Sequence, residues 1–359
     1  MDKIRVAILG QGRSGRDIHA INIAPLEEFE IVAIAEPMTD RRKRAKKEYG
    51  CTVVADYKEL FAMKDKIDLV INCTMSHQHY PVTLDLLNNG FNVLCEKPIA
   101  GKAAEVDDLI RVSKEKGVMF AVFQQSRLLP WFVKAKEIMN SGILGRIIQI
   151  NIHWMNNFSR RWDWQTIQGF TAGSLYNSGP HPVDQALNLL NYDGMPDVKC
   201  FMNRVNTFGD AEDYVKLILS APDRPVIDVE IASCVAYKPF AFNVYAERGG
   251  LMSDGRRIDY KYYIPAEAKA QNLITTPLKD AEGLPCFCSE NLLLHEGTWE
   301  MAPNITDVFE YNTKMFYKMI YAHMREGKEL LVTPQEVRQQ IAVMEEAHRQ
   351  NPLSVTVKV

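Results

Sequence analysis

The sequence predicts an α/β protein that starts with a doubly wound parallel sheet and continues into an α+β domain with an open, mostly antiparallel sheet. Three observations support this prediction. Short apolar segments alternate with helical segments through about residue 123. A glycine-rich turn follows the first apolar segment directly. In the second half, strand-like segments alternate between apolar and polar residues, as in a sheet with one covered face.

The first predicted unit spans residues 4–36. A buried strand over 4–9 leads into the turn Gly10-Gln11-Gly12-Arg13-Ser14-Gly15, a helix over 16–24 and a second buried strand over 31–35. Gly10 allows the tight turn, Gly12 lets a pyrophosphate approach the backbone, and Gly15 lets the helix pack closely on the strand. Glu36 follows the last glycine by roughly 20 residues, where a carboxylate can accept both ribose hydroxyls of NAD. This order predicts a dinucleotide-binding unit rather than a glycine turn that binds nothing.

Helices and strands continue to alternate along the rest of the first domain. We expect helices over 39–49, 57–63, 81–88 and 103–116, and strands over 52–55, 68–74, 92–95 and 118–123. Ligands bind beyond the carboxyl ends of such strands, which selects the loops 74–79, 96–98 and 124–127. Lys97 lies in one of them. Beside a nicotinamide its pKa would fall from about 10.4, so that it could act on a substrate hydroxyl. An exposed loop lysine is an equal alternative.

The second domain mixes helices with alternating strands. We expect helices over 130–140, 183–190 and 307–325, strands over 146–154, 214–219, 225–231 and 240–245, and a last helix that begins at a capping box, Thr333-Pro334-Gln335-Glu336. Residues 259–305 are polar and irregular, which predicts a loop-rich insertion able to close over the active site. The polar face of the sheet is either wetted or paired with another subunit.

Residues 159–190 are chemically dense. His181 and Asp184 are three residues apart, on one face of a helix entry, where His181 is either a general base or a capping or core histidine. Trp162 and Asp163 suit the wall of a polyol pocket. Trp162 and the nearby Trp164 could equally be core residues.

Composition excludes several classes of protein. The 359 residues fit two domains, and a net charge of −3 gives no electrostatic reason to expect nucleic acid. No apolar run approaches the ~20 residues that span a bilayer, so we expect no membrane partner. The seven scattered cysteines suggest reduced thiols in a cytoplasmic protein. Cys286 and Cys288 lack a second pair to complete a zinc site, and we expect no metal.

The chain resembles the glucose–fructose oxidoreductase / inositol dehydrogenase / rhizopine catabolism (Gfo/Idh/MocA) family over nearly its whole length. The matching segments are the glycine turn with Glu36, Asp68-Leu69-Val70-Ile71 leading to Thr74 and His79, Cys95-Glu96-Lys97-Pro98, Ser141-Gly142-Ile143-Leu144-Gly145, and Gly179-Pro180-His181-Pro182-Val183-Asp184. Met75 stands where proline is usual in the family.

The resemblance implies a Rossmann domain over 1–125 and an α+β domain over 126–359 that binds substrate and forms a homodimer or homotetramer through its open sheet. It implies hydride transfer to or from a sugar, cyclitol or related polyol, with Lys97 and His181 as the catalytic pair. The expected cofactor-binding residues are Gly10, Gln11, Gly12, Arg13, Ser14, Gly15, Glu36, Arg41, Thr74, His79 and Glu96. The expected substrate-binding residues are Lys97, Arg127, Trp162, Asp163, Asn177, His181 and Asp184.

One position departs from the family. Many characterised members carry aspartate four residues before the histidine, whereas this chain has Asn177. An amide orients by hydrogen bonding but cannot accept a proton or sustain an imidazolium. We therefore expect His181 to be less basic and Lys97 to handle more of the proton transfer, unless the redox chemistry is altered or lost.

Three functions remain open on the sequence. The first is an NAD-dependent sugar or polyol dehydrogenase, the second a redox-neutral enzyme that cleaves glycosides while keeping NAD bound, and the third a cofactor-reading regulator without activity. Glu36 favours NAD, because a 2′-phosphate beside a carboxylate is repelled. Arg41 and Arg42 soften that repulsion, so NADP is disfavoured rather than excluded.

Overall fold

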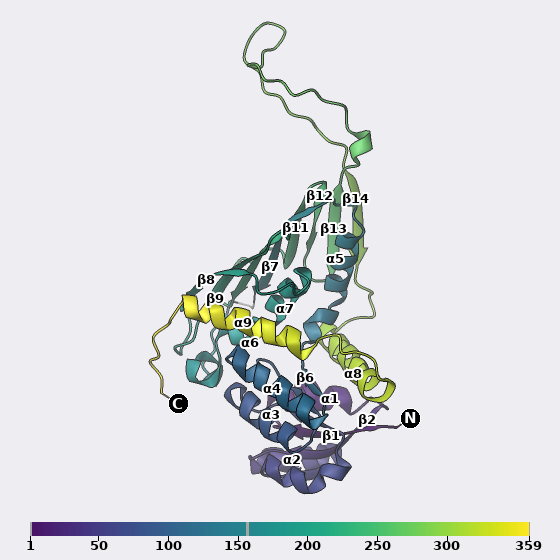
Figure 1. Ribbon diagram of the computed structural model, residues 1–359, viewed down its shortest axis with the longest axis vertical. Helices are drawn as coiled ribbons and strands as arrows, with labels where there is room; N and C mark the ends of the chain where they lie inside the picture. Colours follow the sequence, from purple (N-terminus) through teal and green to yellow (C-terminus); the bar gives the residue numbers. More distant parts are fainter. Residues whose placement is uncertain (1, 156–157, 359) are drawn as a thin grey trace.

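Figure 1 shows the computed structural model, which describes residues 2–155 and 158–358. The first sheet has the order β3-β2-β1-β4-β5-β6, and all its pairs are parallel. Its strands are β1 (Ile4–Leu9), β2 (Phe29–Ala35), β3 (Thr52–Val54), β4 (Leu69–Asn72), β5 (Val93–Cys95) and β6 (Phe120–Val122). The order reverses between β1 and β4, and ligands of doubly wound sheets bind in the crevice at that point.

Helical segments connect these strands. They are η1 (Arg13–Ala20), α1 (Ile21–Ile23), α2 (Thr39–Tyr49), η2 (Tyr57–Lys66), η3 (Ser76–Gln78), α3 (His79–Asn88), α4 (Ala103–Lys116) and η4 (Gln125–Leu128). The strands are apolar because helices cover both faces of the sheet, and β4 is buried at every position. Gly50 and Gly117 end α2 and α4 in the left-handed conformation that a side chain would disfavour.

The second sheet has the order β14-β13-β12-β11-β7-β10-β9-β8. Its strands are β7 (Ile147–Met155), β8 (Asp197–Asn203), β9 (Tyr214–Ser220), β10 (Val226–Ala232), β11 (Phe242–Ala246), β12 (Gly249–Ser253), β13 (Arg257–Tyr262) and β14 (His295–Glu300). Strands β7 and β10 are parallel, and the other pairs of described strands are antiparallel. Buried residues alternate with partly exposed ones along β9, so one face of this sheet is open. The predicted fold class is confirmed.

The helical segments of the second half are α5 (Pro130–Asn140), η5 (Trp164–Thr166), η6 (Gln168–Phe170), α6 (Ser174–Asn177), α7 (Pro180–Leu189), η7 (Pro265–Glu267), α8 (Val308–Glu326) and α9 (Pro334–Gln350). The predicted capping box starts α9, because Glu336 N donates to Thr333 Oγ1 at 3.2 Å and Thr333 N to Glu336 Oε2 at 2.8 Å.

Helix α8 packs on the first sheet although it lies near the end of the chain. Phe316, Tyr317 and Ile320 share a buried core with strand residues such as Ile4 and Ile8. Helix α9 runs between the two sheets beside α4 (Figure 1). The chain therefore crosses back to the first domain before it ends.

The prediction for residues 259–305 needs correction. Strands β13 and β14 pair over much of that range, from Arg257↔Glu300 to Tyr262↔His295. The connection between them, residues 263–294, is almost entirely exposed and projects from the end of the sheet remote from the first domain (Figure 1). It does not cover the crevice. Strand β13 does alternate polar residues with Ile258, Tyr260 and Tyr262, so a usable strand signal was overlooked there. Strand β14, at the edge of the sheet, is mostly polar and gives a weaker signal.

Candidate active site

The glycine turn has the geometry of a phosphate cradle. Gly10 has φ +88°, and a Cβ on it would lie 2.7 Å from the carbonyl oxygen of Cys73. A Cβ on Gly15 would lie 1.9 Å from the carbonyl oxygen of Gly10, which no real structure tolerates. The helix begins at Arg13, three residues earlier than predicted. The first amides of a helix have no intrahelical acceptor and attract anions, so the residues present fit a dinucleotide pyrophosphate.

Glu36 is buried at the end of β2 and ties this turn in place. Its Oε2 accepts from Gln11 N at 2.7 Å, and its Oε1 accepts from Met38 N at 2.8 Å. The nearest guanidinium nitrogen of Arg41 lies 3.9 Å away. Each carboxylate oxygen keeps a second lone pair, which is what a ribose hydroxyl needs.

The loops after β4 and β5 are joined by His79. Its Nδ1 lies 2.7 Å from the carbonyl oxygen of Pro98, and its Nε2 lies 3.0 Å from that of Thr74. Asn72 holds the other side, where its Oδ1 accepts from the Thr74 hydroxyl at 2.7 Å. The His79 ring is almost fully buried. His79, one of the predicted cofactor-binding residues, therefore holds together the two loops that face the crevice.

Lys97 lies half-buried at this edge of the sheet. Its Nζ donates to the backbone carbonyl of Asn177 at 2.7 Å, and its own N–H donates to Glu96 Oε2 at 3.1 Å. Burial lowers the pKa of Lys97, Glu96 opposes that change, and the positive charges of Arg13 and Arg161 add to it. The ammonium is thereby brought closer to losing its proton at neutral pH.

His181 lies in the first turn of α7 and is buried. Its Nδ1 is 3.1 Å from the Ser126 hydroxyl, and its ring packs on Trp154 with centroids 5.2 Å apart. Burial, and then the charge of Lys97, lower the pKa of His181 to about 3. The imidazole is therefore neutral at physiological pH, and it lies close enough to Lys97 to feel its charge.

Arg127 and Asp184 form a buried ion pair. The five N–H groups of Arg127 are all engaged. Their acceptors are Asp184 Oδ1 and Oδ2, Glu336 Oε2, the carbonyl oxygen of Leu331 and the Tyr192 hydroxyl. No donor of this guanidinium is left for a substrate. These contacts support a role in joining η4 to α7 and α9.

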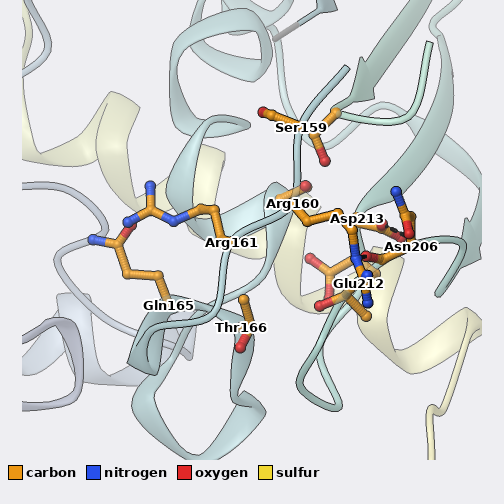
Figure 2. A pocket seen from close by; sticks show the side chains of 11 residues that line it. Ser159, Arg160, Arg161, Gln165, Thr166, Asn206, Glu212 and Asp213 are labelled. Carbon is orange, nitrogen blue, oxygen red and sulfur yellow. Dashed lines mark hydrogen bonds between the residues drawn. The ribbon is translucent and has the colours of Figure 1, made fainter. Parts of the chain in front are cut away.

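The predicted aromatic wall lies at the surface. Trp162 is 82% exposed, and Asp163 accepts from Arg161 at 2.6 Å. Figure 2 shows the adjoining pocket, where Arg161 and Gln165 lie on one side and Arg160, Asn206, Glu212 and Asp213 on the other. Arg161 is the member of this group whose charge reaches Lys97.

Four residues around the catalytic groups were not among the predicted site residues. They are His19, Ser126, Trp154 and Tyr317. His19, Trp154 and Tyr317 belong to predicted helices or strands, but their contacts with the site depend on how distant segments pack. Ser126 lies in the loop 124–127, which was selected as a ligand loop without naming this residue.

Comparison with known proteins agrees with this geometry. Residues 4–124 match the description "Oxidoreductase family, NAD-binding Rossmann fold" of GFO_IDH_MocA, and residues 132–252 match the GFO/IDH/MocA C-terminal domain. The chain belongs to the GFO/IDH/MocA oxidoreductase family. The Rossmann domain and the Gfo/Idh/MocA resemblance predicted from the sequence are thereby confirmed.

Two curated relatives and one solved structure are similar to this chain over most of its length. Scyllo-inositol 2-dehydrogenase (NADP(+)) IolW of Bacillus subtilis is 27% identical over 353 residues, covering 97% of this chain and 93% of that protein. The 2,7-anhydro-N-acetylneuraminate hydratase of Mediterraneibacter gnavus is 24% identical over 71% of this chain and 68% of its own length. An NAD-binding protein from Listeria innocua superposes with a TM-score of 0.78 at 18% identity, covering 99% of this chain and all of that chain.

Proposed function

We propose that this oxidoreductase transfers a hydride between NAD and a secondary hydroxyl of a sugar, cyclitol or related polyol. The observation that carries the proposal is the hydrogen bond of Lys97 Nζ to the Asn177 carbonyl, four residues before His181, which burial and the charge of Lys97 keep neutral. The name of the inositol dehydrogenase relative supports the substrate class. Glu36 supports NAD over NADP, although that relative is named for NADP.

The residues of this chain divide the proton chemistry between them. The bound nicotinamide supplies the hydride acceptor in the direction of oxidation. Lys97, in its neutral form, takes the hydroxyl proton at Nζ, and the Asn177 carbonyl aims that nitrogen. His181 stays neutral and holds the same hydroxyl through Nε2, because Ser126 engages Nδ1. Reduction uses the same groups, with Lys97 starting as the ammonium.

A panel of polyols with NAD or NADP, followed by the absorbance of reduced nicotinamide, tests this function. Lys97→Met is expected to lower kcat by about 10²–10⁴-fold, as for loss of a general acid–base group, while nucleotide binding persists. Lys116→Met, which removes an exposed lysine from α4, serves as the matched control. Full activity in both Lys97→Met and His181→Phe would refute the assigned roles.

A redox-neutral reaction is the second candidate, because one relative is named as a hydratase. In that case, product forms from an oxidised and then re-reduced sugar with no net NADH. Nucleotide that copurifies with the protein, together with turnover that needs no added NAD, would favour it.

We further propose that the open face of the second sheet pairs with another copy of the chain.

A further inference from the structure

A buried hydrogen-bonded chain lies behind Lys97. His19 Nε2 is 3.1 Å from Glu96 Oε1, and His19 Nδ1 contacts the Tyr317 hydroxyl. His19 and Tyr317 are fully buried, and Glu96 is 4% exposed. The three groups come from η1, the loop after β5 and α8. These hydrogen-bonded side chains thus link a helix near the end of the sequence to Glu96, the residue directly before Lys97.

The direction of the hydrogen bonds follows from the chemistry of the two ends. Burial raises the pKa of Tyr317 well above its ordinary value, so its hydroxyl keeps its proton and donates to Nδ1 of His19. Nε2 of His19 then carries the imidazole proton and donates to Glu96. The other carboxylate oxygen of Glu96 accepts from the N–H of Lys97 at 3.1 Å.

Glu96 is ionised although it is buried. Burial by itself would raise its pKa, but His19, through its hydrogen bond and then its charge, and after it the charge of Lys97 bring the pKa to about 2. An ionised carboxylate directly beside Lys97 in turn favours the ammonium, against burial, Arg13 and Arg161. The protonation of Lys97 therefore depends on a group that His19 keeps charged.

We propose that Tyr317 and His19 are positioning residues that hold Glu96 ionised and oriented beside Lys97, and so set the pH range in which Lys97 exchanges a proton. This inference rests on the proposed function for the role of Lys97. The charged and titratable groups that face this cluster are Arg13, Cys73, His79, Cys95, Arg161 and His181. Of these described groups, none donates a hydrogen bond to Glu96 Oε1 as His19 does.

The pH profile of kcat/KM for polyol oxidation tests the proposal. The acid limb of this profile reports the loss of the Lys97 proton. His19→Phe removes the donor to Glu96, so the buried carboxylate takes up a proton and Lys97 loses its counter-charge. We expect the acid limb to move to lower pH by about one unit. Tyr317→Phe should move it less in the same direction, and His19→Gln, which keeps an N–H donor, should restore most of the original profile.

A double-variant comparison separates a path through Glu96 from a general loss of packing. Glu96→Gln should shift the acid limb at least as far as His19→Phe, and the double variant should shift no further than Glu96→Gln. Phe316→Leu, which thins the same core without touching the chain of hydrogen bonds, should lower stability and leave the limb in place. An unmoved limb in His19→Phe, or additive shifts in the double variant, would overturn the proposal.

Nitrogen NMR of the full-length protein, with labelled histidine, gives a readout that does not require activity. We expect the His19 proton that faces Glu96 to lie on Nε2, and Tyr317→Phe to shift the Nδ1 signal of His19. A proton on Nδ1 would contradict the proposed hydrogen bonds from Tyr317 to His19 and from His19 to Glu96. If Lys97→Met kept full activity while the His19 proton lay on Nε2, the proposed function would fail. The hydrogen-bonded series Tyr317–His19–Glu96 would still be supported.

Discussion

Burial lowers the pKa of the half-buried Lys97 and of the buried His181. The pKa of Lys97 is lowered towards the physiological range, whereas that of His181 falls to about 3. A lower pKa makes a lysine a better proton acceptor, whereas a histidine that stays neutral can only orient the substrate. Asparagine at position 177 agrees with this division, because its contact with Lys97 is made by the backbone carbonyl.

Arg127 gives a prediction at the scale of the single residue. Arg127→Met should lower the free energy of unfolding by about 3–5 kcal/mol, because it leaves the fully buried Asp184 without its cation. Denaturant unfolding measures this loss. Arg338→Met, which breaks an ion pair with Asp107 at the surface, is the control and should cost about 1 kcal/mol or less. An equal loss in the free energy of unfolding for the two variants would show that Arg127 does not stabilise the fold through its buried ion pair.

At the scale of the element, the end of β2 decides between the two nucleotides. Glu36→Gln keeps the size of the side chain and one oxygen that can accept from Gln11 N or Met38 N, but it removes the negative charge. Like-charge repulsion of the 2′-phosphate then disappears, and Arg41 is left to attract it. We expect the kcat/KM ratio for NADP over NAD to rise by about tenfold, which corresponds to ~1.4 kcal/mol.

The control for this variant is Glu30→Gln, an exposed change in the same strand. It should leave the nucleotide preference unchanged. If Glu36→Gln lowered the efficiency with both nucleotides equally, Glu36 would act on the shape of the turn and not on the choice of cofactor.

Elements with strong local signals could be predicted from the sequence. Helices α4 and α5 have the predicted bounds, and the capping box at Thr333 starts α9 as expected. Strand β12 was not predicted from the sequence, because it begins with Gly249 and Gly250. A Cβ on Gly249 would lie 1.9 Å from the carbonyl oxygen of Lys261, so the glycine is required by a neighbouring strand that the local sequence does not reveal.

At the scale of the whole molecule, His348 couples α9 to the segment that positions Lys97. Its Nε2 lies 3.7 Å from Glu212 Oε2, and its ring stacks on Tyr176 with centroids 4.6 Å apart. Glu212 Oε1 accepts from Leu175 N at 2.8 Å at the start of α6, and α6 ends at Asn177. Burial opposes the charge on His348, but the Glu212 carboxylate raises its pKa above the ordinary value.

This raised pKa has a defined sign for stability. The contribution of His348 is fully present below its unfolded pKa of about 6.5 and is lost as the pH rises through the raised folded value. We expect His348→Gln to destabilise the protein more at pH 6 than at pH 9, as measured by urea unfolding. His323→Gln, at a partly exposed position of α8 where the ring contacts the Lys328 carbonyl and not a carboxylate, is the control for replacing a histidine. A loss of equal size at both pH values would exclude the pairing with Glu212.

The site as a whole could be predicted only in part. The glycine turn, Glu36, Lys97 and His181 stand in local patterns that the sequence displays. The contact of His19 with Tyr317 spans 298 positions, and that of Arg127 with Glu336 spans 209. Such contacts arise when helices near the end of the chain pack on the first sheet, and no local pattern encodes them.

The return of α8 to the first sheet restricts how this protein can be divided. A fragment that ended at residue 125 would expose Phe29 and Phe123, which now pack on Tyr317 and Phe316. Recombination with a relative by a single crossover between the two domains would pair one parent's Rossmann core with the other parent's closing helix. Viable chimaeras therefore need two crossovers, so that the nucleotide module and its distant helix are inherited together.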